Sequence, residues 1–158
     1  MGVVWQRSTN AQTDNVIAPS HHGPCLVYMA RMDKPIDDPV WFKVYEQGYD
    51  SDSKLWCTDV LRANNGLLEF TIPADIRSGD YLLRTEIIAL HAASKLGKVQ
   101  FYPNCAQLSV EGSGSADPKG YSIPGIYKAD DPGLLFNLYK PYTNYTIPGP
   151  PIYEAGSE

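Results

Sequence analysis

One long apolar segment constrains the fold of this chain more than any other feature. The segment Tyr81–His91 follows a turn sequence, Ser78-Gly79-Asp80, and is apolar on both faces apart from residues 84–86. A strand with two apolar faces is covered on both sides, which places it at the centre of a sandwich. Helical spacing can also be drawn through this segment, but its β-branched residues and the preceding turn favour a strand.

The other strand signals predict an all-β protein. Strands are expected at Gly23–Ala30, Val40–Glu46, Leu67–Ile72 and Val99–Val110, the last with a kink at Pro103 because proline cannot donate a ladder hydrogen bond. Thirteen prolines, thirteen glycines and eleven tyrosines favour short strands and tight turns over packed helices. We therefore predict a β-sandwich.

Alternation within two of these strands predicts which side chains share a face. In Gly23–Ala30, the side chains of residues 25, 27 and 29 should lie opposite those of residues 26, 28 and 30. In Val40–Glu46, Trp41, Lys43 and Tyr45 should alternate against Phe42 and Val44.

The last third of the chain has a different composition. A Gly-Ser link at residues 112–115 leads into residues 118–158, which hold most of the prolines, many tyrosines and one further strand signal at Leu134–Tyr139. Long irregular segments of this kind normally wrap over a sheet. No internal repeat is visible, so residues 1–158 are expected to form a single domain.

Charge and hydropathy exclude two classes of partner. The net charge of −5 disfavours nucleic acid, whose phosphates require a basic face, whereas a neutral glycan would tolerate it. No apolar stretch is long enough to span a bilayer, so no membrane partner is expected. Residues 1–5 lack the basic start and apolar centre of a signal peptide, which by itself predicts a cytoplasmic protein.

All three histidines lie in two short stretches, which also hold a glutamine and a tyrosine. His21 and His22 precede a Gly-Pro pair on a loop, and His91 ends the central strand. If the segments Tyr81–His91 and Val99–Val110 pair antiparallel, His91 lies opposite Gln100, with Tyr102 nearby. Imidazole and phenol donors suit copper or iron. The alternatives are solvent-exposed loop histidines, a hydrogen-bonded core histidine and a half-buried polar pair.

The cysteine count is odd. Cys25, Cys57 and Cys105 cannot all pair within the chain, so one is free or pairs elsewhere. Pairing of Cys25 with Cys57 is possible, but the sequence does not decide it.

Six motifs together resemble the fungal lytic polysaccharide monooxygenases of auxiliary activity family 9, formerly glycoside hydrolase family 61. They are SHHGPCLVYMA at residues 20–30, WFKVYEQG at 41–48, GDYLLRTEIIALH at 79–91, QFYPNCAQL at 100–108, IPGIY at 123–127 and NYTIPGP at 144–150. The resemblance runs from about residue 3 to about residue 153.

This resemblance implies a fold, an activity and partners. The fold is an immunoglobulin-like or fibronectin-III-like β-sandwich with a long C-terminal loop wrap. The activity is copper-dependent oxidative cleavage of cellulose and related β-1,4-glucans, with one copper ion per domain. The reaction takes an external electron donor and either O2 or H2O2. A secreted monomer is expected.

The resemblance also implies residue roles. Family members bind copper through a brace made of an amino-terminal histidine and a second histidine, which corresponds to His21, while His22 falls at a variable position. Tyr102 corresponds to the axial tyrosine. His91 and Gln100 correspond to a pair that hydrogen-bonds the oxygen species, and such outer groups tune a metal site. Tyr145 matches a sugar-stacking position, with packing of the C-terminal wrap as its alternative; Tyr139 and Tyr142 are weaker candidates.

The chain also departs from the family pattern. It begins with Met1-Gly2 rather than histidine, so we expect an N-terminal truncation that removes the brace histidine, the first strands and the cysteine that pairs with Cys105. Copper binding and activity of this chain should then be weak, and a longer chain beginning with histidine should recover both. The alternative function is a non-catalytic glycan-binding remnant. A hydrolase would need a carboxylate pair, and no such pair is evident.

The sequence Asn144-Tyr145-Thr146 also fits the N-glycosylation rule for secreted proteins. A glycan on Asn144 would compete with sugar stacking by Tyr145.

Overall fold

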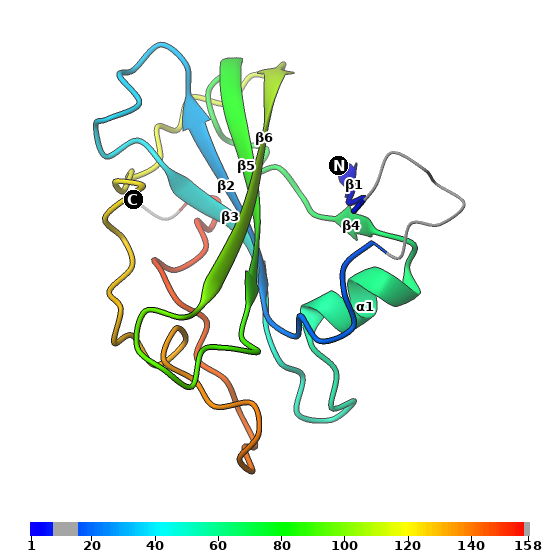
Figure 1. The fold of residues 1–158 in the computed structure, drawn as a ribbon. Coiled ribbons are helices and arrows are strands. Elements are labelled where there is room, and N and C mark those ends of the chain that lie inside the picture. The colour runs from blue at the N-terminus through cyan, green and yellow to red at the C-terminus, as the bar shows by residue number, and fades with distance from the viewer. Residues whose placement is uncertain (8–15, 157–158) are drawn as a thin grey trace.

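The protein is built around one antiparallel sheet, seen in the computed structural model of residues 1–7 and 16–156 (Figure 1). The sheet has the strand order β3-β2-β5-β6. A two-stranded sheet pairs β1 with β4, and a short helix, α1, precedes β4. The elements are β1 (Gly2–Val4), β2 (Cys25–Arg31), β3 (Phe42–Gln47), α1 (Cys57–Ala63), β4 (Leu67–Glu69), β5 (Gly79–Ala89) and β6 (Gln100–Val110).

The all-β sandwich prediction is confirmed, and β5 is its central strand. β5 pairs with β2 on one side and with β6 on the other, and its side chains become fully buried toward its C-terminal end. Both faces of the sheet are covered at β2 and along the C-terminal part of β5, whereas β6 is largely exposed, and this coverage explains why β5 is apolar on both sides.

The first face of the sheet packs against α1 and the β1-β4 pair. We call its buried residues the first core: Ile17, Cys25, Val27, Met29, Phe42, Val44, Cys57, Leu61, Leu68, Phe70, Ile76, Tyr81, Leu83 and Ile87. A disulfide between Cys25 and Cys57, with Cα atoms 5.8 Å apart, ties β2 to α1. This bond settles the pairing that the sequence left open, and Cys105 is an exposed free thiol.

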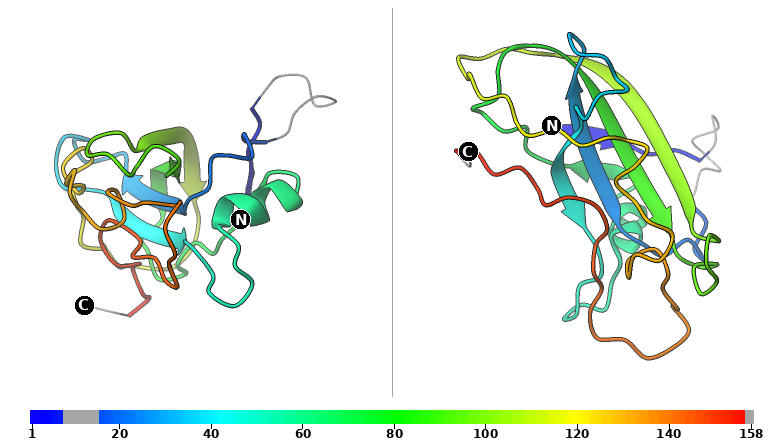
Figure 2. Two further views of the ribbon diagram at one scale, coloured as in Figure 1. Left: turned by 60° about the horizontal axis from the view of Figure 1, so that its bottom comes forward. Right: turned by 90° about the vertical axis from the view of Figure 1, so that its left-hand side faces the viewer.

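The second face is covered by the irregular C-terminal segment, drawn in orange to red (Figure 2). The second core consists of Leu26, Tyr28, Ala30, Val40, Trp41, Trp56, Ile88, Leu90, Ala93 and Leu134. Side chains from residues 123–147 pack against it. Two isolated bridges, Lys43 in β3 with Ile152 and Trp41 just before β3 with Tyr121, fix the segment to this edge of the sheet. The predicted wrap is therefore confirmed.

Two expectations for element positions were wrong. The segment Leu134–Tyr139 is not a strand, because its backbone bonds locally: the N–H groups of Leu134 and Leu135 both donate to Asp131 O at 2.8 Å. Helix α1 was not predicted at all. Its sequence signal is Asp59, which lies three residues after Trp56. The Asp59 carboxylate accepts the Trp56 N–H at 2.9 Å and so caps the first turn of the helix.

The face predicted for Tyr45 was also wrong. Tyr45 pairs with Val27 but Lys43 pairs with Tyr28, so Val44 is an extra residue in β3. Such a bulge shifts the alternation by one residue, and Tyr45 packs on the first core beside Val44 rather than opposite it. The faces predicted for β2 are correct.

The β5-β6 ladder runs without a register shift from Gly79 opposite Val110 to Ala89 opposite Gln100. The ladder shows no bulge at Pro103, which pairs with Glu86. β6 is the edge strand of its sheet, where a proline can be tolerated because one side of the backbone has no ladder to complete. In the part of the chain that the structure describes, no helix is long and apolar enough to traverse a bilayer.

Candidate metal centre

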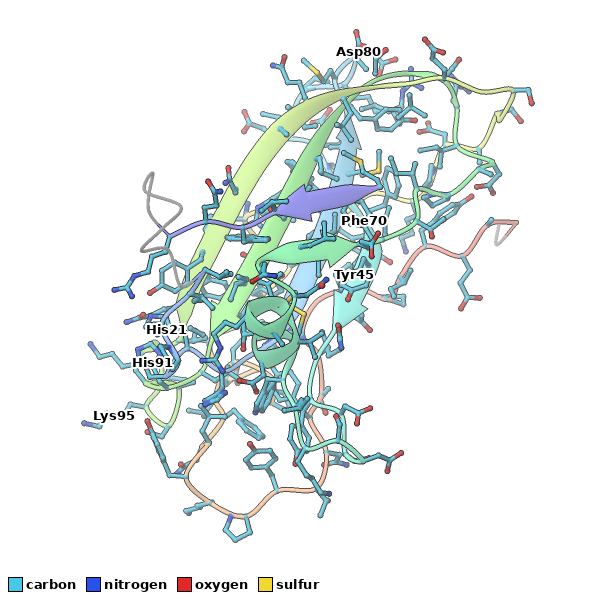
Figure 3. All side chains as sticks on the ribbon, turned by 90° about the vertical axis from the view of Figure 1, so that its right-hand side faces the viewer. His21, Tyr45, Phe70, Asp80, His91 and Lys95 are labelled. Atoms are coloured by element: carbon cyan, nitrogen blue, oxygen red, sulfur yellow. A yellow bond between two sulfur atoms is a disulfide. The ribbon has the colours of Figure 1, made fainter. Side chains whose placement is uncertain are left out.

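The loop that carries the two adjacent histidines is clamped between β5 and α1. The Leu90 N–H donates to His22 O at 2.9 Å, and the Gly23 N–H donates to the Thr58 hydroxyl at 3.1 Å. A Cβ atom on Gly23 would lie 1.8 Å from Ile88 O, so only glycine allows this close approach. The clamp fixes His21 at the end of the sheet where β5 finishes and β6 begins, opposite the end that carries Asp80 (Figure 3).

His21, His91 and Tyr102 form one cluster at this end. The rings of His21 and His91 have centroids 4.4 Å apart and planes tilted by 33°. The Nε2 atom of His21 lies 3.0 Å from the Tyr102 hydroxyl, and that hydroxyl donates to the Gln100 side-chain oxygen at 2.7 Å. The structure therefore brings together four of the residues that the sequence singled out.

The predicted strand partner of His91 was wrong. Gln100 lies opposite Ala89, and His91 is two residues beyond the end of β5, in the turn that follows. Every second residue of a strand lies on the same face, and residues 87 and 89 lie opposite Tyr102 and Gln100. Position 91 continues this series, so His91 lies on the same side as Gln100 and Tyr102. The cluster therefore forms through stacking on His21 rather than through direct cross-strand pairing.

A single proton arrangement satisfies the cluster. With the Tyr102 hydroxyl donating to Gln100, its oxygen can accept a proton from His21 Nε2. The Nδ1 atom of His21 then accepts from the Ser20 hydroxyl, which lies 3.2 Å away. His21 is neutral in this arrangement.

The surroundings also favour the neutral form of His21. Partial burial is the main cause that lowers its pKa below the ordinary value, and the positive charges of His91 and Arg7 lower it further. A neutral imidazole is the form that binds metal ions.

His22 belongs to a different set of contacts. Its Nδ1 atom lies 3.0 Å and 3.2 Å from the two carboxylate oxygens of Asp59. Asp59 also accepts from the Arg62 guanidinium at 2.5 Å and caps α1 through Trp56. Asp59 is the functional neighbour that the sequence reasoning missed, and its only signal was the capping pattern at the start of α1.

The tyrosines proposed for sugar contact are placed differently from one another. The Tyr145 ring packs on Trp56 and Phe136, with centroids 4.7 Å and 5.2 Å away, and its hydroxyl donates to Gly133 O at 2.6 Å. This placement matches the packing alternative. Tyr139 is 76% exposed, and its hydroxyl donates to His91 O at 3.1 Å, beside the cluster.

The cluster opens into a pocket of about 400 Å³. His21 and Tyr102 line one side of it, and the other lining residues are Trp5, Gln6, Arg7, Val16, Ile17 and Ala18. Within residues 1–7 and 16–156, no group of three or more His, Cys, Asp or Glu side chains is arranged to hold a metal ion.

Comparison with known proteins identifies the family. The sequence model of Auxiliary Activity family 9, formerly GH61, matches residues 2–146. The chain belongs to this family.

Individual relatives agree with this assignment. The chain is 45% identical over 154 residues to the AA9 family lytic polysaccharide monooxygenase A of Aspergillus niger, covering 97% of this chain and 37% of that protein. It is 49% identical over 146 residues to the monooxygenase AA9-X282 of Trametes coccinea, covering 89% of this chain and 53% of that protein. The chain thus spans about half or less of the length of these curated relatives.

Solved structures show the same fold. The structure named CvAA9A superposes with a TM-score of 0.89 at 38% identity, covering 99% of this chain and 73% of that one. A cellulose-active polysaccharide monooxygenase from M. thermophila superposes with a TM-score of 0.72 at 34% identity, covering 84% of this chain and 65% of that one.

Proposed function

We propose that this chain carries part of a copper-dependent site for the oxidative cleavage of cellulose or a related β-1,4-glucan. The observation that supports the proposal most is the contact of His21 with both His91 and Tyr102, which joins three side chains from three distant segments. Family membership supplies the chemical context.

The residues of the cluster fit copper. A neutral imidazole from His21 and a phenol oxygen from Tyr102 are donors that suit this metal better than calcium or magnesium. The Nδ1 atom of His91 is buried and has no hydrogen-bond partner among the described residues, so the cluster holds a polar atom that a ligand or ordered water could satisfy. His21 and Tyr102 would hold the ion, and the bound ion would supply the redox chemistry, with an external electron donor and O2 or H2O2 as co-substrates.

The other residues of the cluster would orient and hydrogen-bond. Gln100 accepts the Tyr102 proton and so fixes the direction of the phenol oxygen lone pairs. His91 stacks on His21 and limits rotation of that ring. Tyr139 presents an exposed ring at the same end of the sheet and is a better candidate for stacking on a sugar than the packed Tyr145.

A second function rests on the same exposed tyrosine. Because Tyr139 offers a sugar-stacking face without any metal, the chain could bind glycan without cleaving it.

One experiment separates the two functions. The folded chain is incubated with Cu(II), ascorbate and swollen cellulose, and mass spectrometry measures oxidised oligosaccharides. We expect oxidised product that disappears in His21→Ala and on chelation of copper. Binding to cellulose with no oxidised product at any copper concentration would favour the glycan-binding function instead.

A further inference from the structure

The outer side of β6 is an open strand edge that carries no charge. β6 is an edge strand of the four-stranded sheet, and most of its side chains are exposed (Figure 1). Its sequence, QFYPNCAQLSV, contains no charged residue. Natural proteins protect such edges with charged side chains, proline, bulges or short strands, because the unpaired N–H and C=O groups pair readily with another chain. β6 is long, its ladder with β5 has no register shift, and Pro103 is the one protecting residue within it.

Two grooves with partly apolar walls run beside this edge. The first has a volume of about 120 Å³ and lies between β6 and residues 3–5. The second has a volume of about 420 Å³ and lies between residues 108–111 and the segment around Pro73. A strand that paired with β6 would direct every second side chain toward these grooves.

β6 is complementary to a second copy of itself. Cys105 is the central residue of Gln100–Val110. If two β6 strands pair antiparallel about a twofold axis through this residue, Cys105 lies opposite the partner's Cys105. Tyr102 then lies opposite the partner's Leu108, and an aromatic residue opposite an aliphatic one stabilises an antiparallel pair. Because the strand has no charged residue, no like charges meet across the axis.

We propose that this chain forms a dimer through β6, in which the two four-stranded sheets join edge to edge. The family resemblance implies a monomer, so the proposal differs from that expectation. Pro103 removes one backbone donor from each strand, but it lies opposite the partner's Gln107 and leaves the central pairs intact. The two candidate metal centres lie at opposite ends of the joined sheet, because each lies at the start of its own β6 and the two strands run antiparallel.

Cys105 makes this register measurable, since its thiol is free and exposed. Directly opposite residues of an antiparallel pair have Cα atoms about 4.5 or 5.5 Å apart, within the range that a disulfide spans. Oxidised glutathione can take two electrons from the two Cys105 thiols. Their two protons pass to the glutathione sulfurs, which gives two glutathione thiols and one disulfide between the copies.

Gln107 provides a matched control position. It is exposed and lies two residues after Cys105, on the same face of β6. In the proposed register the two copies of residue 107 are offset by four positions, so their Cα atoms lie about 14 Å apart. A disulfide cannot span that distance.

The test uses the full chain. Sedimentation equilibrium of the reduced chain over a concentration series should show a reversible dimer with twice the mass of one chain. Cys105→Ser removes only the thiol and should change the dimer dissociation constant by less than about threefold. With oxidised glutathione, the unchanged chain should give a covalent dimer. The double variant Cys105→Ser, Gln107→Cys should dimerise reversibly but give no covalent dimer.

Three results would overturn the proposal. The first is a reduced chain that sediments as a monomer at every concentration, which would mean that no second copy covers the edge. The second is equal covalent dimer from the unchanged chain and from the double variant, which would indicate random collision or another interface. The third is a reversible dimer that gives no covalent product through Cys105, which would place the contact elsewhere on the surface.

Discussion

The Nε2 atom of His21 lies 3.0 Å from the hydroxyl oxygen of Tyr102, although 81 positions separate the two residues in the chain. Their meeting depends on the glycine clamp that holds the His21 loop against β5 and on the β5-β6 ladder that carries Tyr102. His22, the adjacent histidine, is instead paired with Asp59. The two adjacent histidines therefore have different partners.

His21→Ala should abolish the Cu(II) binding of this chain, whereas His22→Ala should leave it nearly unchanged. The reason is that His21 faces the phenol oxygen, while the Nδ1 atom of His22 is occupied by a carboxylate. Calorimetry with Cu(II) alone gives the two affinities. The reverse ordering would make His22 the metal ligand and contradict the assignment.

Gln100→Ala should retain copper binding but lower the yield of oxidised product. The substitution removes only the acceptor that orients the Tyr102 hydroxyl, and loss of a supporting group of this kind costs about 10- to 100-fold in activity or affinity. Tyr102→Phe should also keep copper but change its paramagnetic resonance spectrum, because it removes an oxygen donor. An unchanged spectrum in Tyr102→Phe would show that the phenol oxygen is not near the ion.

His21 should titrate below pH 6.5 in the folded chain. The pKa of His21 is lowered by burial and by the positive charges of His91 and Arg7. The neutral imidazole therefore persists at a pH below 6.5, the ordinary pKa of histidine. Copper bound through His21 should accordingly be retained below pH 6.5 and lost as the pH falls through the lowered pKa. NMR titration of the imidazole measures this value.

His91→Phe is the control for that titration. It keeps a ring for stacking but removes one charge, so the His21 pKa should move back toward 6.5. A His21 pKa unaffected by this change would show that His91 exerts no electrostatic influence on it.

Glu86 is expected to be a stability residue. It is 1% exposed, pairs with Arg84 at 2.7 Å and accepts the Tyr127 hydroxyl at 2.7 Å, which anchors the C-terminal segment to β5. Glu86→Gln leaves the Arg84 charge without its partner and should lower the free energy of unfolding by about 3 kcal/mol. Tyr127→Phe should cost about 1–3 kcal/mol, because it leaves a buried carboxylate oxygen unsatisfied.

Denaturant unfolding measures both changes. Tyr139→Phe removes the same group, a tyrosine hydroxyl, from an exposed site and should change the free energy of unfolding by less than about 0.5 kcal/mol. Equal effects for Tyr127→Phe and Tyr139→Phe would contradict the anchoring role.

Asn144 should carry an N-linked glycan when the chain is passed through a eukaryotic secretory pathway. Asn144 and Thr146 are exposed, while the packed ring of Tyr145 holds the loop in place between them. Mass spectrometry before and after glycosidase treatment detects the glycan. Thr146→Ala should remove it, and Asn137→Gln, which lies outside any acceptor sequence, should not.

Several features of the protein were determined by local sequence. Alternation and turn chemistry placed β2, β5 and β6 to within about two residues, because period-two burial and a Gly-Asp turn are properties of short segments. The proline- and tyrosine-rich composition of residues 118–158 likewise indicated a segment that wraps over the sheet. The residues of the cluster were selected by donor chemistry and by resemblance to a family.

Other features depended on contacts between distant segments. The bulge at Val44 reversed the face of Tyr45, and nothing in the alternation of β3 signals it, since the extra residue is defined only by pairing with β2. His22 pairs with Asp59 while His21 faces Tyr102, and a carboxylate 37 positions away leaves no trace in the sequence around His22. Likewise, burial of Tyr145 and exposure of Tyr139 follow from how the C-terminal segment lies on the second core, and packing of that kind is settled only when the tertiary structure forms.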